Sequence, residues 1–182
     1  MKGVVFNEFL EMVESKYGLT KLDQVIEGSD LKSKGIYTSI GNYESHEFFQ
    51  LIGSLSKHTS IPTEDLLYDY GNHFFAFLAK TYPQIFQLYK TPLALLKSVD
   101  EHIHLQVRKI YPDARLPSIT VNEKSRKVAE IKYTSNRGLY KFAEALISKT
   151  FDHYDRKCKI TTEMLSPDGK NVIFLIEHDE TS

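Results

Sequence analysis

Apolar side chains recur every three to four residues through most of the first two-thirds of the chain, which is the spacing of amphipathic helices. The opening segment is typical, because Phe6, Phe9 and Val13 fall on one face of a helix. Residues 28–41 are rich in Gly, Ser and Lys and are expected to form a loop. The pattern and its start signals predict helices over residues 4–16, from a cap at Thr20, from a cap at Ser45, and over 63–80, 83–90 and 92–111.

After Pro117 the pattern changes to an alternation of apolar and polar residues, which is typical of strands. It predicts strands over residues 118–122, 127–133, 157–164 and 172–178. An apolar face over residues 138–149 predicts one more helix, and residues 166–169 form a strong hairpin-turn sequence. The expected fold is therefore α+β, with a helical N-terminal part followed by a small antiparallel sheet and one packed helix, in a single domain over residues 1–182.

The composition excludes several classes of protein. A chain of 182 residues with a formal net charge of −1 lacks the bulk charge that binds nucleic acid or an anionic membrane surface. It has no apolar run long enough to insert into a membrane and no signal peptide, and its one cysteine, Cys158, cannot form an internal disulfide. The expected location is the cytoplasm. Eleven Phe and 11 Tyr residues can fill a core or wall a flat apolar cofactor.

A spaced set of five residues indicates the chemistry. Twelve residues separate His104 from Pro117, fifteen separate Pro117 from Tyr133, and Tyr133, Ser135 and Arg137 form a Tyr-x-Ser-x-Arg cluster. A histidine can ligate iron, and two hydroxyls with a guanidinium on one face of an extended segment can hold carboxylates. Together these groups suit a haem with its propionates, whereas the cluster alone would equally suit a solvated strand edge.

This spacing, the string at residues 99–109 and the opening residues 1–6 resemble the haem–nitric oxide/oxygen-binding (H-NOX) domain family nearly from end to end. The resemblance implies a haem b with His104 as the iron ligand and with Tyr133, Ser135 and Arg137 at the propionates. It implies that Pro117 presses on the macrocycle and helps to bend it. It also divides the chain into a distal helical subdomain, residues 1–62, and a proximal subdomain with the sheet, residues 63–182, with the haem buried between them.

The choice among seven histidines depends on this resemblance. On one helix over residues 92–111, His104 lies beside one edge of the apolar stripe and His102 beside the other edge, about 200° away. Periodicity therefore does not choose between them, and the two rings cannot bind one metal together. The family spacing fits His104 and misses His102 by two residues.

The resemblance also names the wall of the gas pocket: Val5, Phe9, Phe74, Leu78, Phe142 and Leu146. Family members that hold O₂ have a tyrosine at the position of Phe142 and another polar residue at that of Phe74. A wall without a donor costs bound O₂ roughly 1–3 kcal/mol, whereas NO binds ferrous haem tightly without one. The expected ligands are NO and CO, with O₂ excluded. Tyr140 lies about 160° from Phe142 on a helix and is not expected to replace the missing donor.

The implied function is sensing rather than catalysis. In the family, NO binding can break the iron–histidine bond and release the helix that carries the histidine, and a partner reads this change. The chain is expected to be a sensor alone, without a kinase or cyclase after it, so the expected partner, by analogy with stand-alone bacterial members, is a separate histidine kinase or cyclic-di-GMP enzyme. A haem enzyme, either a peroxidase or an NO-metabolising one, would need a distal acid–base group, which the inferred pocket lacks. A haem-free interaction domain is the other alternative.

Some family members carry a structural zinc held by several cysteines and a histidine in the C-terminal half. Here Cys158 and His153 alone cannot make a closed tetrahedral site, so no structural zinc is expected. Cys158 is expected to be an ordinary strand residue.

Overall fold

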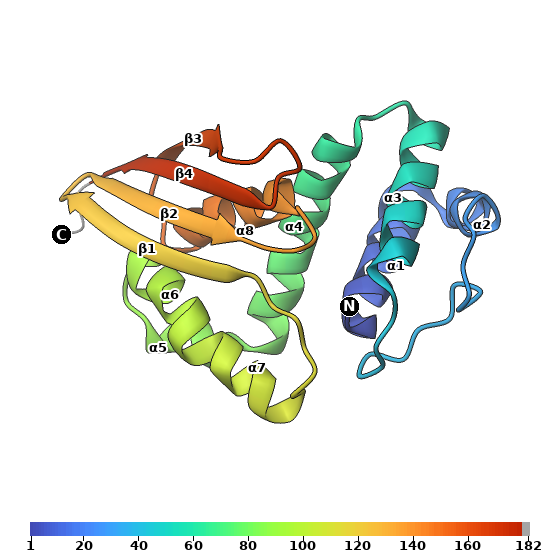
Figure 1. Cartoon of the computed structure of the whole chain (residues 1–182), viewed down its shortest axis with the longest axis horizontal. Coiled ribbons are helices and arrows are strands. Elements are labelled where there is room, and N and C mark those ends of the chain that lie inside the picture. The colour runs from blue at the N-terminus through green and yellow to red at the C-terminus, as the bar shows by residue number, and fades with distance from the viewer. Residues whose placement is uncertain (180–182) are drawn as a thin grey trace.

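The computed structural model describes residues 1–179 and has a helical N-terminal part and a C-terminal sheet on opposite sides of one long helix, α4 (Figure 1). The helices are α1 (Gly3–Tyr17), α2 (Leu19–Glu27), α3 (Ser45–Thr59), α4 (Thr63–Thr81), α5 (Pro83–Leu88), α6 (Pro92–Ser98), the π-helix η1 (Val99–Ile103), α7 (His104–Ile110) and α8 (Tyr140–His153). The strands are β1 (Ser118–Ser125), β2 (Val128–Thr134), β3 (Cys158–Met164) and β4 (Asn171–His178). The α+β fold expected from the sequence is confirmed.

Two expected helix caps are wrong. Gly18, with φ 85°, lets the chain turn directly from α1 into α2, so α2 begins before Thr20 and no side chain caps it. Likewise α3 begins at Ser45 itself after an extended Glu44, and again no side chain caps it. In both places the start of the helix is set by the direction in which the preceding segment enters it.

The sheet has the order β1-β2-β4-β3, and every neighbouring pair is antiparallel. Ile131 in β2 pairs with Val121 in β1 and with Phe174 in β4, which sets the register across the centre. Alternate residues of the inner strands are fully buried, because α8 and α6 cover that face. The sheet therefore fixes the position at which the loop between β2 and α8 begins.

Three groups of buried side chains form the core. The first joins α1, α2, α3 and the first half of α4, the second lies between the sheet and the helices α6 and α8, and the third lies around α5, α6 and the second half of α4. Helix α4 contributes Tyr70 to the first group and Phe75 to the third. Helix α4, which begins at the proposed boundary between residues 62 and 63, thus packs against the N-terminal helices on one side and against the C-terminal part on the other.

The helix expected over residues 92–111 is not one regular α-helix. Its middle turn, η1, is a π-helix, in which the His104 backbone N–H donates to the Val99 carbonyl five residues earlier. π-Turns inside α-helices occur frequently at functional sites. The inserted residue shifts the faces of α7 relative to α6, so a helical wheel drawn through all twenty positions places His102 and His104 incorrectly.

Gly71 allows α4 and α8 to approach closely. A Cβ atom at this position would lie 2.6 Å from the Ala145 Cβ and 2.8 Å from the Phe142 carbonyl oxygen. Glycine is therefore required for the contact that holds Phe142 against α4.

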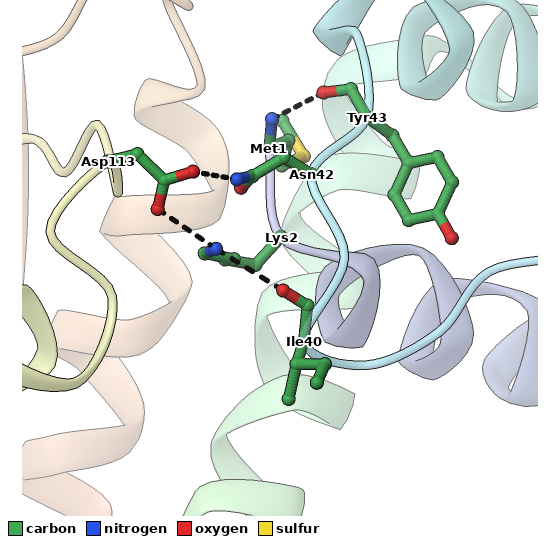
Figure 2. A network of polar contacts seen from close by, with 6 residues as sticks. All are labelled: Met1, Lys2, Ile40, Asn42, Tyr43 and Asp113. Carbon is green, nitrogen blue, oxygen red and sulfur yellow. Dashed lines mark hydrogen bonds and ion pairs between the residues drawn. The ribbon is translucent and has the colours of Figure 1, made fainter.

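The first residues of the chain are fixed at the junction of the two halves (Figure 2). The Met1 amino group donates to the Tyr43 carbonyl at 2.5 Å, and Lys2 forms a β-bridge with Asn42. The Lys2 ammonium contacts Asp113, in the loop after α7, at 3.2 Å. Within residues 1–179, none of the helices combines the length and the hydropathy needed to cross a membrane.

Candidate functional site

Of His102 and His104, His104 is the one that turns inward. It is the first residue of α7, its side chain is 12% exposed, and its Nδ1 lies 3.2 Å from the Asp100 carboxylate. Burial lowers the pKa of His104 even though Asp100 raises it, so the ring is neutral at physiological pH. His102 is exposed, and its Nδ1 lies 3.1 Å from the Tyr89 hydroxyl. The neutral ring of His104 has the protonation state that binds a metal.

Pro117 lies next to this ring. The Pro117 backbone is one of the groups that raise the pKa of His104, so the two residues separated by twelve positions lie close together. The next residue, Ser118, donates from Oγ to the second oxygen of Asp100 at 2.9 Å. Burial raises the pKa of Asp100, but the hydrogen bonds from His104 and Ser118 outweigh burial and the net shift is downward. Asp100 is therefore a carboxylate at neutral pH, and it holds Nδ1 as the donor.

The sequence predicted that the Tyr-x-Ser-x-Arg cluster lies on one face of an extended segment. In the structure it does not. Tyr133 is in β2 and 2% exposed, but the strand ends at Thr134, and Arg137 lies in a turn in which its backbone N–H donates to Ser135 Oγ at 3.2 Å. The turn forms because Gly138 has φ 65° and packs on the β3–β4 hairpin, where a Cβ would lie 2.3 Å from the Asp168 carbonyl oxygen. The three side chains still lie near one another: burial raises the pKa of Tyr133, whereas Ser135 and the charge of Arg137 lower it.

Positive charge accumulates beside this cluster. Arg137 donates to the Arg115 backbone carbonyl at 2.6 Å, and burial together with the charge of Arg115 lowers the pKa of Arg137. The pKa of the Met1 amino group is lowered by burial and then by Arg137, Lys2 and Arg115, whereas Asp113 opposes them. Among the described residues that act on this group, cations thus outnumber acids, and a ligand with carboxylates would relieve the imbalance.

The six residues predicted for the gas pocket lie on the three helices α1, α4 and α8. Val5, Phe9, Phe74 and Phe142 belong to the first core group, and Leu78 and Leu146 belong to the third together with Ile103 of η1. The rings of Phe74 and Phe142 lie 5.4 Å apart. Except for the buried Phe9, these apolar side chains remain partly exposed. Apolar and aromatic side chains between helices are the usual lining of a cofactor site.

Two hydroxyl groups near this wall are already engaged. Tyr70, which is 1% exposed and stacks on Phe142 with ring centroids 5.1 Å apart, donates its hydroxyl to the Val5 carbonyl at 2.6 Å. Tyr140 donates to Glu64 at 2.8 Å, and its ring packs with the sheet group, away from Phe142. Sequence reasoning missed Tyr70, although its position one turn before Phe74 on α4 was the signal that would have found it.

Cys158 lies at the start of β3 and is partly buried. Burial raises the pKa of its thiol to about 11, so the thiol stays protonated at neutral pH. Among residues 1–179, no group of three or more His, Cys, Asp or Glu side chains lies close enough together to hold a metal ion.

These residues fit a haem in chemical type. A neutral imidazole suits the iron, hydroxyls with excess cations suit the propionates, and partly exposed aromatic and aliphatic side chains suit the macrocycle and a small gas.

Comparisons with known proteins give the same answer. Residues 2–162 match the family model described as Haem-NO-binding. An Fe(II) unliganded H-NOX protein from K. algicida is 42% identical over 100% of this chain and 98% of its own, with a TM-score of 0.94. An H-NOX from Shewanella woodyi in the Fe(II)CO state is 33% identical over 97% of this chain and 94% of its own, with a TM-score of 0.83.

An H-NOX protein from S. oneidensis in the Fe(II)NO state shares the fold, with a TM-score of 0.89 at 24% identity over 99% of this chain and 100% of its own. A search of curated proteins finds no match. The family match covers most of the sequence, and the K. algicida and S. woodyi proteins each cover nearly all of it. The chain therefore belongs to the Haem-NO-binding (H-NOX) family, a family of haem-based gas sensors.

Proposed function

We propose that this protein senses NO at ferrous haem b, also binds CO, does not hold O₂, and regulates a separate signalling protein. The observation that carries the proposal is the engagement of Tyr70: its ring stacks on Phe142, but its hydroxyl donates to the Val5 carbonyl and is not offered to a ligand. O₂ bound to iron needs a donor, because it carries partial negative charge, whereas NO does not.

The proposed haem contacts follow from the site. His104 would bind the iron, and Tyr133, Ser135 and Arg137 would hold the propionates, with Pro117 against the macrocycle. When bound, haem would supply a ferrous iron that can bind a diatomic gas. The apolar side chains of Val5, Phe9, Phe74, Leu78, Phe142 and Leu146 would exclude water and offer no proton to the ligand.

The helix that carries His104 is the proposed route of the signal. Its N-terminal end is tied to Asp100 and its C-terminal loop to Lys2, at the junction of the two halves. A change in the position of His104 would therefore reach both halves of the molecule, which is the behaviour of a two-state element biased by a ligand. The partner, a histidine kinase or a cyclic-di-GMP enzyme, is proposed by analogy with stand-alone family members.

The test is a set of absorption spectra of the haem-loaded, reduced protein under argon, air, CO and NO. We expect the spectrum under air to match that under argon until oxidation sets in, and distinct spectra with CO and NO. A stable oxygen complex would contradict the proposed selectivity. If no Soret band appears after haem is supplied, the protein is a haem-free interaction domain.

A further inference from the structure

Asp100 joins His104 to the sheet through both of its oxygens. Oδ1 lies 3.2 Å from His104 Nδ1, and Oδ2 accepts from Ser118 Oγ at 2.9 Å. The two side chains of the first contact are 12% and 26% exposed, so water competes only partly for this hydrogen bond. A carboxylate held at both oxygens has little freedom to turn away from the ring.

The location of Asp100 explains this alignment. It lies in the π-turn η1, four residues before His104, and the backbone N–H of His104 closes that turn on Val99. Ser118 is the first residue of β1 and donates to Asp100 from there. Asp100, which holds the ring, is thus itself held by the edge strand of the sheet.

Arg108 is the competing partner. Its guanidinium lies 3.7 Å from the same oxygen of Asp100, at a side chain that is 44% exposed. At that distance and exposure the ion pair is weak, so it leaves the carboxylate available to His104.

We propose that Asp100 is a positioning residue for His104, which fixes the ring orientation and strengthens the other ring nitrogen as a donor to iron. This inference rests on the proposed ligation of haem by His104. A carboxylate that accepts the Nδ1 proton makes the opposite nitrogen more electron-rich, and loss of such a partner typically costs 10–100-fold in metal affinity, an order-of-magnitude expectation.

The experiment uses the full chain, reduced and loaded with haem. Asp100→Leu removes the acceptor and keeps the branching at Cγ, and Asp100→Asn keeps an acceptor oxygen without the charge. Glu101→Gln is the matched control, because this neighbouring acid is exposed and is not one of the groups that shift the pKa of His104. The measurements are the iron–histidine stretching frequency by resonance Raman and the rate of haem transfer to apomyoglobin.

For Asp100→Leu we expect a lower stretching frequency and a haem loss faster by roughly 10–100-fold, with Asp100→Asn intermediate and Glu101→Gln equal to the parent. Thermal unfolding of the haem-free proteins shows whether the fold itself has changed. A role in folding alone would alter unfolding but would leave the stretching frequency at its parental value, and that result would overturn the proposal.

Ser118→Ala provides a second route if Asp100→Leu does not fold. It removes the hydroxyl that orients Asp100 and should lower the frequency in the same direction, by less. Parental frequencies in both Ser118→Ala and Asp100→Asn would overturn the inference and leave the proposed function intact. A parent protein without any iron–histidine band would overturn both.

Discussion

The Lys2 ammonium lies 3.2 Å from the Asp113 carboxylate and thereby joins the first residues of the chain to the loop that follows α7. The same ammonium lies 4.7 Å from the centre of the Tyr111 ring and 3.3 Å from the Ile40 carbonyl. Asn42 donates to the other oxygen of Asp113, as Figure 2 shows. One acid in the loop after the His104 helix therefore contacts two parts of the N-terminal half.

Replacement of Asp113 by Ala should loosen this junction locally, with only a small loss of overall stability. Asp113 is 60% exposed, so the loss in the free energy of unfolding should stay below about 1 kcal/mol. Hydrogen–deuterium exchange should rise in residues 38–43 and 111–117. The exposed Asp23 on α2 provides the control, as Asp23→Ala should change neither segment. Parental exchange in both segments of Asp113→Ala would show that the contact does not hold the halves together.

Gly71→Ala should separate α4 from α8. The new methyl group would meet the Ala145 Cβ at 2.6 Å and the Phe142 carbonyl at 2.8 Å, and such overpacking costs about 1–3 kcal/mol. Gly53→Ala in α3 is the matched control, because nothing lies within 4 Å of its added Cβ, and it should be neutral or stabilising by up to about 1 kcal/mol. Chemical denaturation measures both. Equal stabilities of the two variants would refute the close helix contact.

Phe142→Tyr tests the gas pocket. A phenol at this position, beside Phe74 and Tyr70, would supply the donor that the wall lacks, and O₂ affinity should rise by roughly ten- to a hundredfold. Tyr140→Phe is the control, since it removes only the hydroxyl bonded to Glu64 and should leave gas binding unchanged. Oxygen equilibria of the reduced proteins decide the matter. If O₂ affinity changed in Tyr140→Phe but not in Phe142→Tyr, residue 140 rather than residue 142 would be the one that faces the gas.

Glu8 predicts a pH dependence of stability. Burial, and then the charge of Glu11, raise the pKa of this acid, which is 9% exposed, whereas His73, 3.4 Å away, and Lys80 lower it. Because the folded state holds the proton more tightly than the unfolded state, the contribution of Glu8 is present at low pH and is lost as the pH rises through its folded pKa.

Glu8→Gln should therefore be more stable than the parent at neutral pH, and the difference should close below about pH 4, where the acid is protonated in both states. The exposed Glu14 on the same helix is the control, and Glu14→Gln should follow the parent at every pH. Urea denaturation across pH 3–8 (roughly the range of carboxyl and histidine titration) gives the curves. If the difference in stability between Glu8→Gln and the parent instead grew as the pH fell, folding would lower the pKa of Glu8 rather than raise it.

The elements were predictable from the sequence because burial repeats with the period of each element. Phe6, Phe9 and Val13 in α1 are all fully buried, as the helical spacing predicted, and Ile131 and Phe174 are buried on the covered face of the sheet. The caps at Thr20 and Ser45 were wrong because they depend on how the chain enters a helix, and that direction is set by distant contacts.

The sequence predicted which of the proposed site residues lie near one another, but not how they are arranged. His104 and Pro117 meet, and Tyr133, Ser135 and Arg137 converge, yet through a turn at Gly138 rather than along one strand face. The π-turn before His104 and the contact of His104 with Asp100 were not predicted, because a helical wheel assumes a constant angle per residue and cannot represent one inserted residue. Their roles towards haem remain proposals.

The most direct measurement compares His104→Ala with His102→Ala, its neighbour on the exposed side, by absorption spectroscopy of the reduced proteins after haem is supplied. We expect His102→Ala to keep the parental ferrous spectrum, and His104→Ala to lose haem or to hold it only when imidazole is added. A parental ferrous spectrum of His104→Ala without imidazole would contradict the assignment of this residue as the iron ligand.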